Sequence, residues 1–213
     1  LTVPGGWGPG NWPTGAFDPE TGVYYAVSHT MPNALSLAPT TDNPDATLAW
    51  AFPRENYVPT PRPHGLPITK PPYGRITALD LNRGELAWMV PNGDSPRNHP
   101  LLRDLNLPPL GIPNRPAPLV TKTLLFLGEG SDAIIGTLRG DGSPSDPEQD
   151  QSWRWGKQFR AYDKATGEVI WKTELPAGTT SGPMTYMHEG RQYIVVAVGT
   201  RDETPEWVAL SLP

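Results

Sequence analysis

Cysteine is absent from this chain of 213 residues, so disulfides, thiolate metal sites and cysteine nucleophiles are excluded. No apolar run approaches the roughly 18–20 residues that a helix needs to span a bilayer. The chain also lacks a cluster of lysine and arginine, and its net charge is −5. Nucleic acid is therefore not expected as a partner, because phosphate binding requires a concentrated basic face. Walker, GxGxxG and Gly-x-Ser-x-Gly motifs are missing as well, which disfavours nicotinamide and nucleotide enzymes.

Residues that interrupt helices are abundant, since the chain has 28 proline and 22 glycine residues. Each interior proline removes a helix hydrogen bond and clashes with the preceding turn, which excludes a helical bundle. Hydrophobic residues make up 37% of the chain, and many of them are aromatic or β-branched and stand in short runs. This arrangement favours a packed β core over disorder.

A repeat is the most specific pattern in the chain. The segments "ALDLNRGELAW" and "AYDKATGEVIW" share the form Ala-x-Asp-x-x-x-Gly-Glu-x-x-Trp. Each copy predicts two strands joined by a turn, in which Asp80 or Asp163 accepts hydrogen bonds from turn amides and the glycine takes positive φ. Trp88 and Trp171 recur at the same phase, as expected of structural anchors.

A second kind of hairpin alternates with this repeat. The segments "TGAFDPETGVYYAVSH", "APLVTKTLLFLGEG" and "GPMTYMHEGRQYIVVAVG" each hold two apolar runs around a short polar turn. Two successive hairpins form a four-stranded antiparallel meander, and the chain contains about two and a half such units. The expected fold is therefore all-β, with about two to three four-stranded blades of a β-propeller. A β-sandwich is the structural rival, but it does not predict the spaced tryptophans.

Residues 1–213 are expected to form one set of propeller blades, which three insertions interrupt. They lie near residues 30–74, 91–115 and 139–156, and long connections of this kind are usually functional or mobile. The stretch "PLLRDLNL" is expected to form a helical turn or two. The stretch "DGSPSDPEQD" lacks the spacing and flanking helices of an EF-hand, so we expect it to be solvated.

Several segments together resemble one family. The "NW" before "AFDPETGVYY", the segments "KPPYGRITALDLNRGELAW" and "RNHPLL", and the segment "SGPMTYMHEGRQYIVVAVG" occur in that order. They resemble the C-terminal part of quinoprotein dehydrogenases of the glucose-dehydrogenase-like branch, which use pyrroloquinoline quinone (PQQ), and the likeness covers residues 1–213. The resemblance implies an oxidoreductase with an eight-bladed propeller, with PQQ and calcium near its axis. It also implies an aspartate base, electron transfer to a quinone or cytochrome, and a periplasmic location, either soluble or membrane-associated through another segment.

The resemblance covers only about the last third of such a propeller. The calcium ligands and catalytic aspartate of the family belong to earlier blades, and no segment here matches them, so we expect no catalytic or metal-binding residue in this chain. Two to three blades leave open apolar sheet faces. We therefore expect a hetero-oligomer, in which a second polypeptide, either a separate subunit or the other part of a cleaved precursor, supplies the remaining blades.

Five residues are candidates for contact with the cofactor. The resemblance places Asn11 and Trp12 at the inner end of a blade, where an amide can donate to an ortho-quinone oxygen and an indole can pack on a flat ring system. From the residues alone, Trp12 can equally be core and Asn11 a turn residue. Arg115 stands at the equivalent place in the next blade, where it either pairs with a PQQ carboxylate or lies at the surface. Thr200 and Arg201 follow the third hairpin and are weaker candidates of the same kind.

The remaining polar and aromatic motifs are expected to be structural. Trp88 and Trp171 are interpreted as residues that dock one blade on the next, and Asp18 heads a turn. The histidines show no metal-like spacing, which disfavours a zinc site, and His99 is expected to be structural; the four are His29, His64, His99 and His188.

Three functions stay open at this point. The first is a component of a PQQ-dependent dehydrogenase that oxidises a sugar or alcohol, active only with a chain that carries the remaining blades. The second is a non-catalytic propeller scaffold that binds proteins. The third is a stand-alone β-rich binding module without a cofactor, which should be a monomer without a partner chain.

Overall fold

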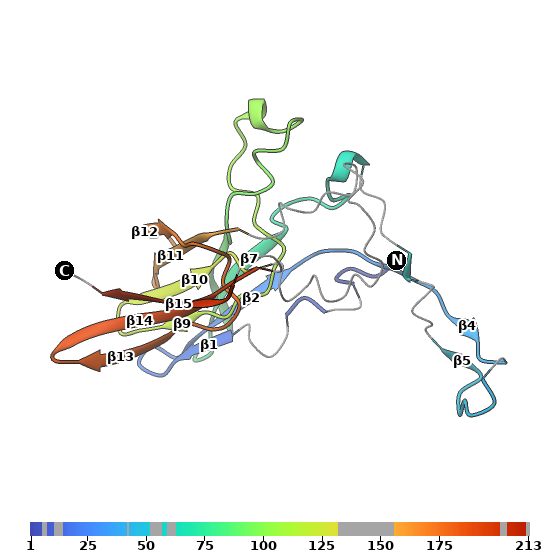
Figure 1. Ribbon diagram of the computed structural model, residues 1–213, viewed down its shortest axis with the longest axis horizontal. Helices are drawn as coiled ribbons and strands as arrows, with labels where there is room; N and C mark the ends of the chain where they lie inside the picture. Colours follow the sequence, from blue (N-terminus) through green and yellow to red (C-terminus); the bar gives the residue numbers. More distant parts are fainter. Residues whose placement is uncertain are drawn as a thin grey trace.

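The computed structural model describes residues 1–5, 8–10, 15–41, 43–51, 57–58, 63–131, 156–200 and 204–211. Regular structure in these residues is almost entirely antiparallel β strand, as predicted (Figure 1). Two single 3₁₀ turns complete it, η2 (Pro63–Gly65) and η3 (Arg103–Leu105). The second of these is the helical turn expected in "PLLRDLNL".

The first sheet is a four-stranded meander in the order β1-β2-β7-β8. Its strands are β1 (Gly15–Asp18), β2 (Val23–His29), β7 (Gly74–Asp80) and β8 (Glu85–Pro91). The plain hairpin β1–β2 thus joins the tryptophan hairpin β7–β8 through the long β2–β7 ladder, which runs from Val23 opposite Asp80 to His29 opposite Gly74. This is the pairing of two hairpins that the sequence predicts.

The second sheet repeats this order, and the third sheet repeats most of it. Sheet 2 contains β9 (Leu119–Val120), β10 (Leu124–Gly128), β11 (Gln158–Asp163) and β12 (Val169–Glu174). Sheet 3 contains β13 (Met184–His188), β14 (Arg191–Val198) and β15 (Glu206–Ser211). Within the described ranges sheet 3 has no fourth strand. The chain therefore forms two complete four-stranded units and a third of three strands, which confirms a partial propeller.

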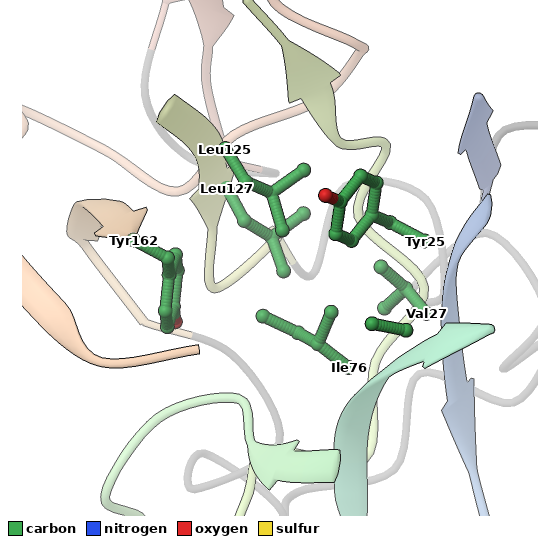
Figure 2. Packing of buried hydrophobic residues seen from close by; sticks show 7 residues of the cluster. Tyr25, Val27, Ile76, Leu125, Leu127 and Tyr162 are labelled. Carbon is green, nitrogen blue, oxygen red and sulfur yellow. The ribbon is translucent and has the colours of Figure 1, made fainter. Parts of the chain in front are cut away.

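Alternating side chains on the strands build two cores, one on each face of sheet 2. Leu125 and Leu127 of β10 pack toward sheet 1, where they meet Tyr25, Val27 and Ile76 in one buried cluster. Figure 2 shows these side chains and Tyr162 converging on a common centre. The residues between them point the other way, because successive side chains of a strand face opposite sides. The second cluster consequently joins sheets 2 and 3; its buried members are Phe126, Phe159, Ala161, Leu175, Ala177, Val196 and Val198.

The short connections between strands and the long ones lie at opposite ends of the sheets. All strand turns within hairpins are short and lie at one end, which we call the turn face; they are residues 19–22, 81–84, 121–123, 164–168 and 189–190. Every longer link leaves and re-enters the sheets at the opposite end, the connection face; these links are residues 30–73, 92–118, 129–157, 175–183 and 199–205. The meander imposes this separation, since every second strand end falls on the same side.

Two of the predicted insertions are described, and both leave from the connection face. The 30–73 link carries two small ladders, β3 (Ala34–Leu35) with β6 (Tyr57–Val58) and β4 (Ala38–Pro39) with β5 (Trp50–Ala51). The 92–114 segment, which we call the excursion, projects away from the sheets (green in Figure 1). The stretch expected near 139–156 lies, except for its last residue, outside the described residues.

Candidate cofactor-binding site

The described cofactor candidates stand on the connection face. Arg115 lies at the end of the link that leads from β8 to β9, the first strand of sheet 2. Thr200 follows β14 in sheet 3, and both side chains are half-buried. Asn11, Trp12 and Arg201 lie outside the described residues. The structure therefore describes two of the five predicted residues, and both lie on the connection face.

Arg115 is fixed to sheet 2 through its neighbour. The Arg115 backbone N–H donates to Asn114 Oδ1 (2.8 Å), and Asn114 Nδ2 donates to the carbonyl oxygen of Glu129 (3.3 Å). Asn114 is buried. Burial lowers the pKa of the Arg115 guanidinium from its ordinary value, because removal from water disfavours the charged form. An anion beside this group would therefore be stabilising, and a carboxylate suits its bidentate geometry.

Buried hydroxyl groups lock sheets 2 and 3 together next to Thr200. The backbone N–H of Gly130 donates to Thr179 Oγ1 (3.2 Å), and the Ser131 hydroxyl donates to the carbonyl oxygen of Gly199. The Gly199 N–H in turn donates to the carbonyl oxygen of Gly178 (3.0 Å). The start of the 199–205 link is thus held in place. Sequence reasoning missed this set, because no spacing connects these positions.

A buried ion pair is the second feature of this face that the sequence did not reveal. Arg160 Nη2 lies 2.6 Å from Glu129 Oε1, and only 5% and 7% of the two side chains are exposed. The Gln158 backbone N–H donates to Glu129 Oε2 (3.2 Å). The signal that could have found the pair is a charged residue next to apolar strand residues in each partner. Glu129 follows the apolar run in "LFLGEG", and Arg160 interrupts the strand-like segment "QFRAY".

The docking role expected of the tryptophans is met at Trp88. Its Nε1–H donates to the carbonyl oxygen of Lys164 on sheet 2 (3.1 Å), and the Tyr25 hydroxyl donates to the same oxygen (3.0 Å). Gly167 lies against the Trp88 ring, where an added Cβ would come within 2.8 Å of a ring atom. Trp171 stands at the same place in sheet 2, and 44% of it is exposed.

The aspartates act as the sequence predicts, with one addition. Asp80 and Asp163 each accept hydrogen bonds from backbone amides of their turns. Asp18 accepts from the Glu20 amide and the Thr21 hydroxyl, and it also pairs with Lys164 of sheet 2 (2.5 Å). Burial alone would raise the pKa of the Asp18 carboxyl, but the hydrogen bonds from Lys164, Thr21 and the Glu20 amide outweigh it and lower the pKa.

Metal-binding groups are not gathered in the described part of the chain, where no cluster of three or more His, Asp or Glu side chains occurs. His99 Nε2 lies 2.9 Å from the carbonyl oxygen of His64, so it ties the excursion to the 30–73 link. This contact agrees with a structural role. No helix in the described residues has the length and apolar character to cross a membrane.

The excursion contains a shallow polar hollow of about 260 Å³. Its walls come entirely from this segment and carry both charges: Asp94, Arg97, Asn98, Leu102, Arg103, Asn106 and Leu107. Arg97 Nη1 lies 3.4 Å from Asp94 Oδ1 within it.

Stacked antiparallel meanders with short turns at one end and long links at the other define a segment of a β-propeller. The chain belongs to the PQQ propeller family, since the family model described as "PQQ: Glucose/ethanol/alcohol dehydrogenase, beta-propeller domain" matches residues 1–140 and 151–194. Two solved structures show the same fold. They are quinohemoprotein alcohol dehydrogenases from Comamonas testosteroni (TM-score 0.54, 23% identity, 97% of this chain and 26% of that chain) and Pseudomonas putida HK5 (TM-score 0.55, 19% identity, 93% and 23%).

The curated relatives are named as dehydrogenases of several substrates. A probable quinate dehydrogenase (quinone) of Xanthomonas campestris pv. juglandis is 32% identical over 70% of this chain and 17% of its own length. A quinoprotein glucose dehydrogenase of Gluconobacter oxydans is 30% identical over 97% of this chain and 22% of its own. The glycerol dehydrogenase large subunit of Gluconobacter thailandicus is 28% identical over 93% and 27%. The chain thus spans about a quarter or less of the relatives it matches.

Proposed function

We propose that this chain forms one side of the cofactor pocket in a PQQ-dependent dehydrogenase that oxidises a sugar or another alcohol. The observation that carries the proposal is the half-buried Arg115 in the link that leads to β9, on the face where the long links leave the sheets. PQQ bears carboxylates and an ortho-quinone, so it requires cations and hydrogen-bond donors. Arg115 supplies a cation of this kind, and Thr200 supplies a donor on the same face.

Each candidate has a role in this proposal. Arg115 and Arg201 pair with carboxylates of the cofactor, and Thr200 donates a hydroxyl hydrogen bond. The Asn11 amide donates to a quinone oxygen, and the Trp12 ring packs on the flat ring system. When bound, the quinone accepts the two electrons and the protons that leave the alcohol as it becomes a carbonyl compound. The chain orients the cofactor and shapes its entrance through the 30–73 and 92–118 links.

The parts of the reaction that this chain does not supply are proposed to lie elsewhere. Calcium ligands and the aspartate that takes the hydroxyl proton belong to the remaining blades, and the acceptor of the electrons is a quinone or a cytochrome. Such an enzyme works in the periplasm, either soluble or held at a membrane by another segment. The variety of substrates among the relatives, which include quinate, glucose and glycerol, leaves the substrate class at sugar or alcohol.

Open apolar faces support a second polypeptide as partner. Sheet 1 turns Phe17 and Met89 outward, away from sheet 2, and sheet 3 does the same with Met184 and Trp207; about half or more of each side chain is exposed. A sheet of a propeller buries both faces against its neighbours, as sheet 2 does. We propose that further blades cover these faces. Denaturing mass spectrometry on the natively purified protein tests this, and a chain found alone as a soluble monomer would contradict it.

Equilibrium dialysis with PQQ and Ca²⁺ tests the cofactor role on the same material. The Arg115→Met variant should weaken PQQ binding about tenfold to a hundredfold, since a hydrogen bond to a charged group contributes about 1.5–3 kcal/mol. The matched control is Arg83→Met, because Arg83 is exposed on the turn face and lies 4.0 Å from Glu85. The control should bind PQQ like the wild type. Absence of PQQ binding by the wild type would refute the proposed function.

A scaffold that binds proteins is the second candidate. It is favoured by the β4–β5 arm, which projects from the body (Figure 1) and exposes Trp50 and Leu48. This function requires no cofactor. A wild-type protein that retains no PQQ, in the dialysis described above, would favour it.

A further inference from the structure

The buried pair Glu129–Arg160 lies beside the predicted cofactor face without belonging to the predicted cofactor contacts. Both groups are more than nine-tenths buried, and a buried ion pair is often no more stabilising than apolar residues of the same volume. Within the described residues, Arg160 Nη1 has no hydrogen-bond partner although it is buried. The arrangement is therefore poor as a source of stability, and its contacts indicate another purpose.

The pair holds the entrance of the excursion. Arg160 Nη2 lies 3.8 Å from Asp94 Oδ2, at the point where the excursion leaves β8. Gly93 has φ of 90°, and an added Cβ there would come within 2.9 Å of Glu129 Oε1. The backbone at Gly93 thus lies directly on the carboxylate, which leaves no room for another side chain.

The same glutamate holds the exit. Asn114 Nδ2 donates to the backbone carbonyl of Glu129 (3.3 Å), and Asn114 Oδ1 accepts from the Arg115 N–H (2.8 Å). The two ends of the excursion are also bonded to each other, since the Ile112 N–H donates to the carbonyl oxygen of Asn92 (2.6 Å). Glu129 thus meets the entrance through its carboxylate and the exit through its main-chain carbonyl. The bond between Ile112 and Asn92 couples the two ends, and Arg115 is the residue that follows the exit.

We propose that Glu129 and Arg160 are positioning residues whose side chains fix the entrance of the excursion and, through the backbone bonds that join its two ends, set where Arg115 meets a carboxylate of the cofactor. The proposal rests on the proposed function, since it assumes that Arg115 faces PQQ. It assigns the pair no contact with the cofactor. Loss of the pair should loosen the excursion and weaken PQQ binding while the sheets persist.

The turn face provides a matched control. Asp18 and Lys164 form a second buried ion pair, with 2.5 Å between Oδ2 and Nζ and with 4% and 12% of the side chains exposed. It joins sheet 1 to sheet 2 at the end opposite the excursion. A purely structural effect of removing a buried charge pair should therefore be similar in both places.

Two variants of the Glu129–Arg160 pair, which we call the clasp variants, and one control variant test the proposal in the natively purified protein. Glu129→Gln removes one charge and leaves buried Arg160 with the half-exposed Asp94, at 3.8 Å, as its counter-ion, so this variant risks misfolding. The double variant Glu129→Gln with Arg160→Met removes both charges and avoids that penalty. The control is Asp18→Asn. Amide hydrogen exchange of residues 92–114 reports local opening, exchange of β14 in sheet 3 is the reference, and dialysis with PQQ and Ca²⁺ reports the dissociation constant.

The expected result is faster exchange in residues 92–114 with unchanged exchange in β14, and a PQQ dissociation constant at least about tenfold higher in the clasp variants. Asp18→Asn should lower the melting temperature and leave the PQQ dissociation constant unchanged. Clasp variants that bind PQQ like the wild type would overturn the inference and leave the proposed function intact. A wild type that does not bind PQQ would overturn the proposed function and the inference with it.

Discussion

Trp88 and Trp171 stand at the same position of the repeat but have different surroundings. Trp88 is docked on sheet 2, where its Nε1–H donates to the carbonyl oxygen of Lys164 (3.1 Å). Trp171 is 44% exposed, and the described part of sheet 3 contains no turn equivalent to the one at Lys164. Replacing each tryptophan by alanine therefore compares the free energy of unfolding lost at a docked position of the repeat with that lost at the equivalent undocked position.

The expected costs differ several-fold. Removal of a buried tryptophan side chain costs about 3–5 kcal/mol, and because Trp88 is only half-buried we expect about 3 kcal/mol for Trp88→Ala. Roughly 1 kcal/mol of this comes from the hydrogen bond to Lys164. Trp171→Ala removes an exposed strand residue, so its cost should stay below about 1 kcal/mol.

Urea unfolding of the purified chain, followed by far-UV circular dichroism, measures both costs. Equal destabilisation by the two variants in the chain alone would refute the assignment of Trp88 as a docking residue. A second measurement extends the reasoning to the open faces. When the proposed partner polypeptide is present and covers Trp171, the cost of Trp171→Ala should rise toward that of Trp88→Ala.

Two further predictions concern an ion pair and a close backbone contact. The pKa of the Asp18 carboxyl in the folded protein lies below its ordinary value of 3.8. As the pH falls, the Asp18 carboxylate of the unfolded chain is therefore protonated before that of the folded protein. The Asp18–Lys164 pair consequently stabilises the fold above the unfolded pKa, and this stabilisation is lost as the pH falls through the folded pKa. A melting-temperature series in acid should therefore fall less steeply for Asp18→Asn than for the wild type, and parallel curves would contradict this. Gly111→Ala and Gly84→Ala both place a Cβ at positive φ, but only at Gly111 would that atom meet backbone, 1.9 Å from the Gly74 carbonyl oxygen. Gly84→Ala should cost about 1–2 kcal/mol and Gly111→Ala at least twice as much in the same urea assay; similar costs would show that the excursion can move away from β7.

Local patterns in the sequence predicted the hairpins and their order. All residues of the Asp-x-x-x-Gly turn in each tryptophan repeat are neighbours in the sequence, so the turn can be predicted from a short window. The structure confirms both the turn bonds of Asp80 and the docking of Trp88. The strand β15 was not predicted, because it is a single run without a hairpin partner next to it in the sequence. Sequence patterns report best on pairs of neighbouring strands.

The polar contacts between sheets could not be predicted, because they join residues that are far apart in the chain. Asp18 and Lys164 are separated by 146 positions, and Asn92 meets Tyr162 across 70. No periodicity encodes such pairs, since their geometry follows from how one twisted sheet stacks on the next.

The middle sheet, with apolar side chains on both faces, has a consequence for synthesis. Sheet 1 leaves the ribosome first and can cover one side of β10, but Phe126 and Phe159, whose rings stack at 6.1 Å, face the other side. They stay in contact with water until β14 has been made. During this interval the continuous apolar run "LLFLG" is the part of the described chain most prone to pair with another molecule. Cells that make this protein are expected to depend on a chaperone or on fast elongation between residues 128 and 198.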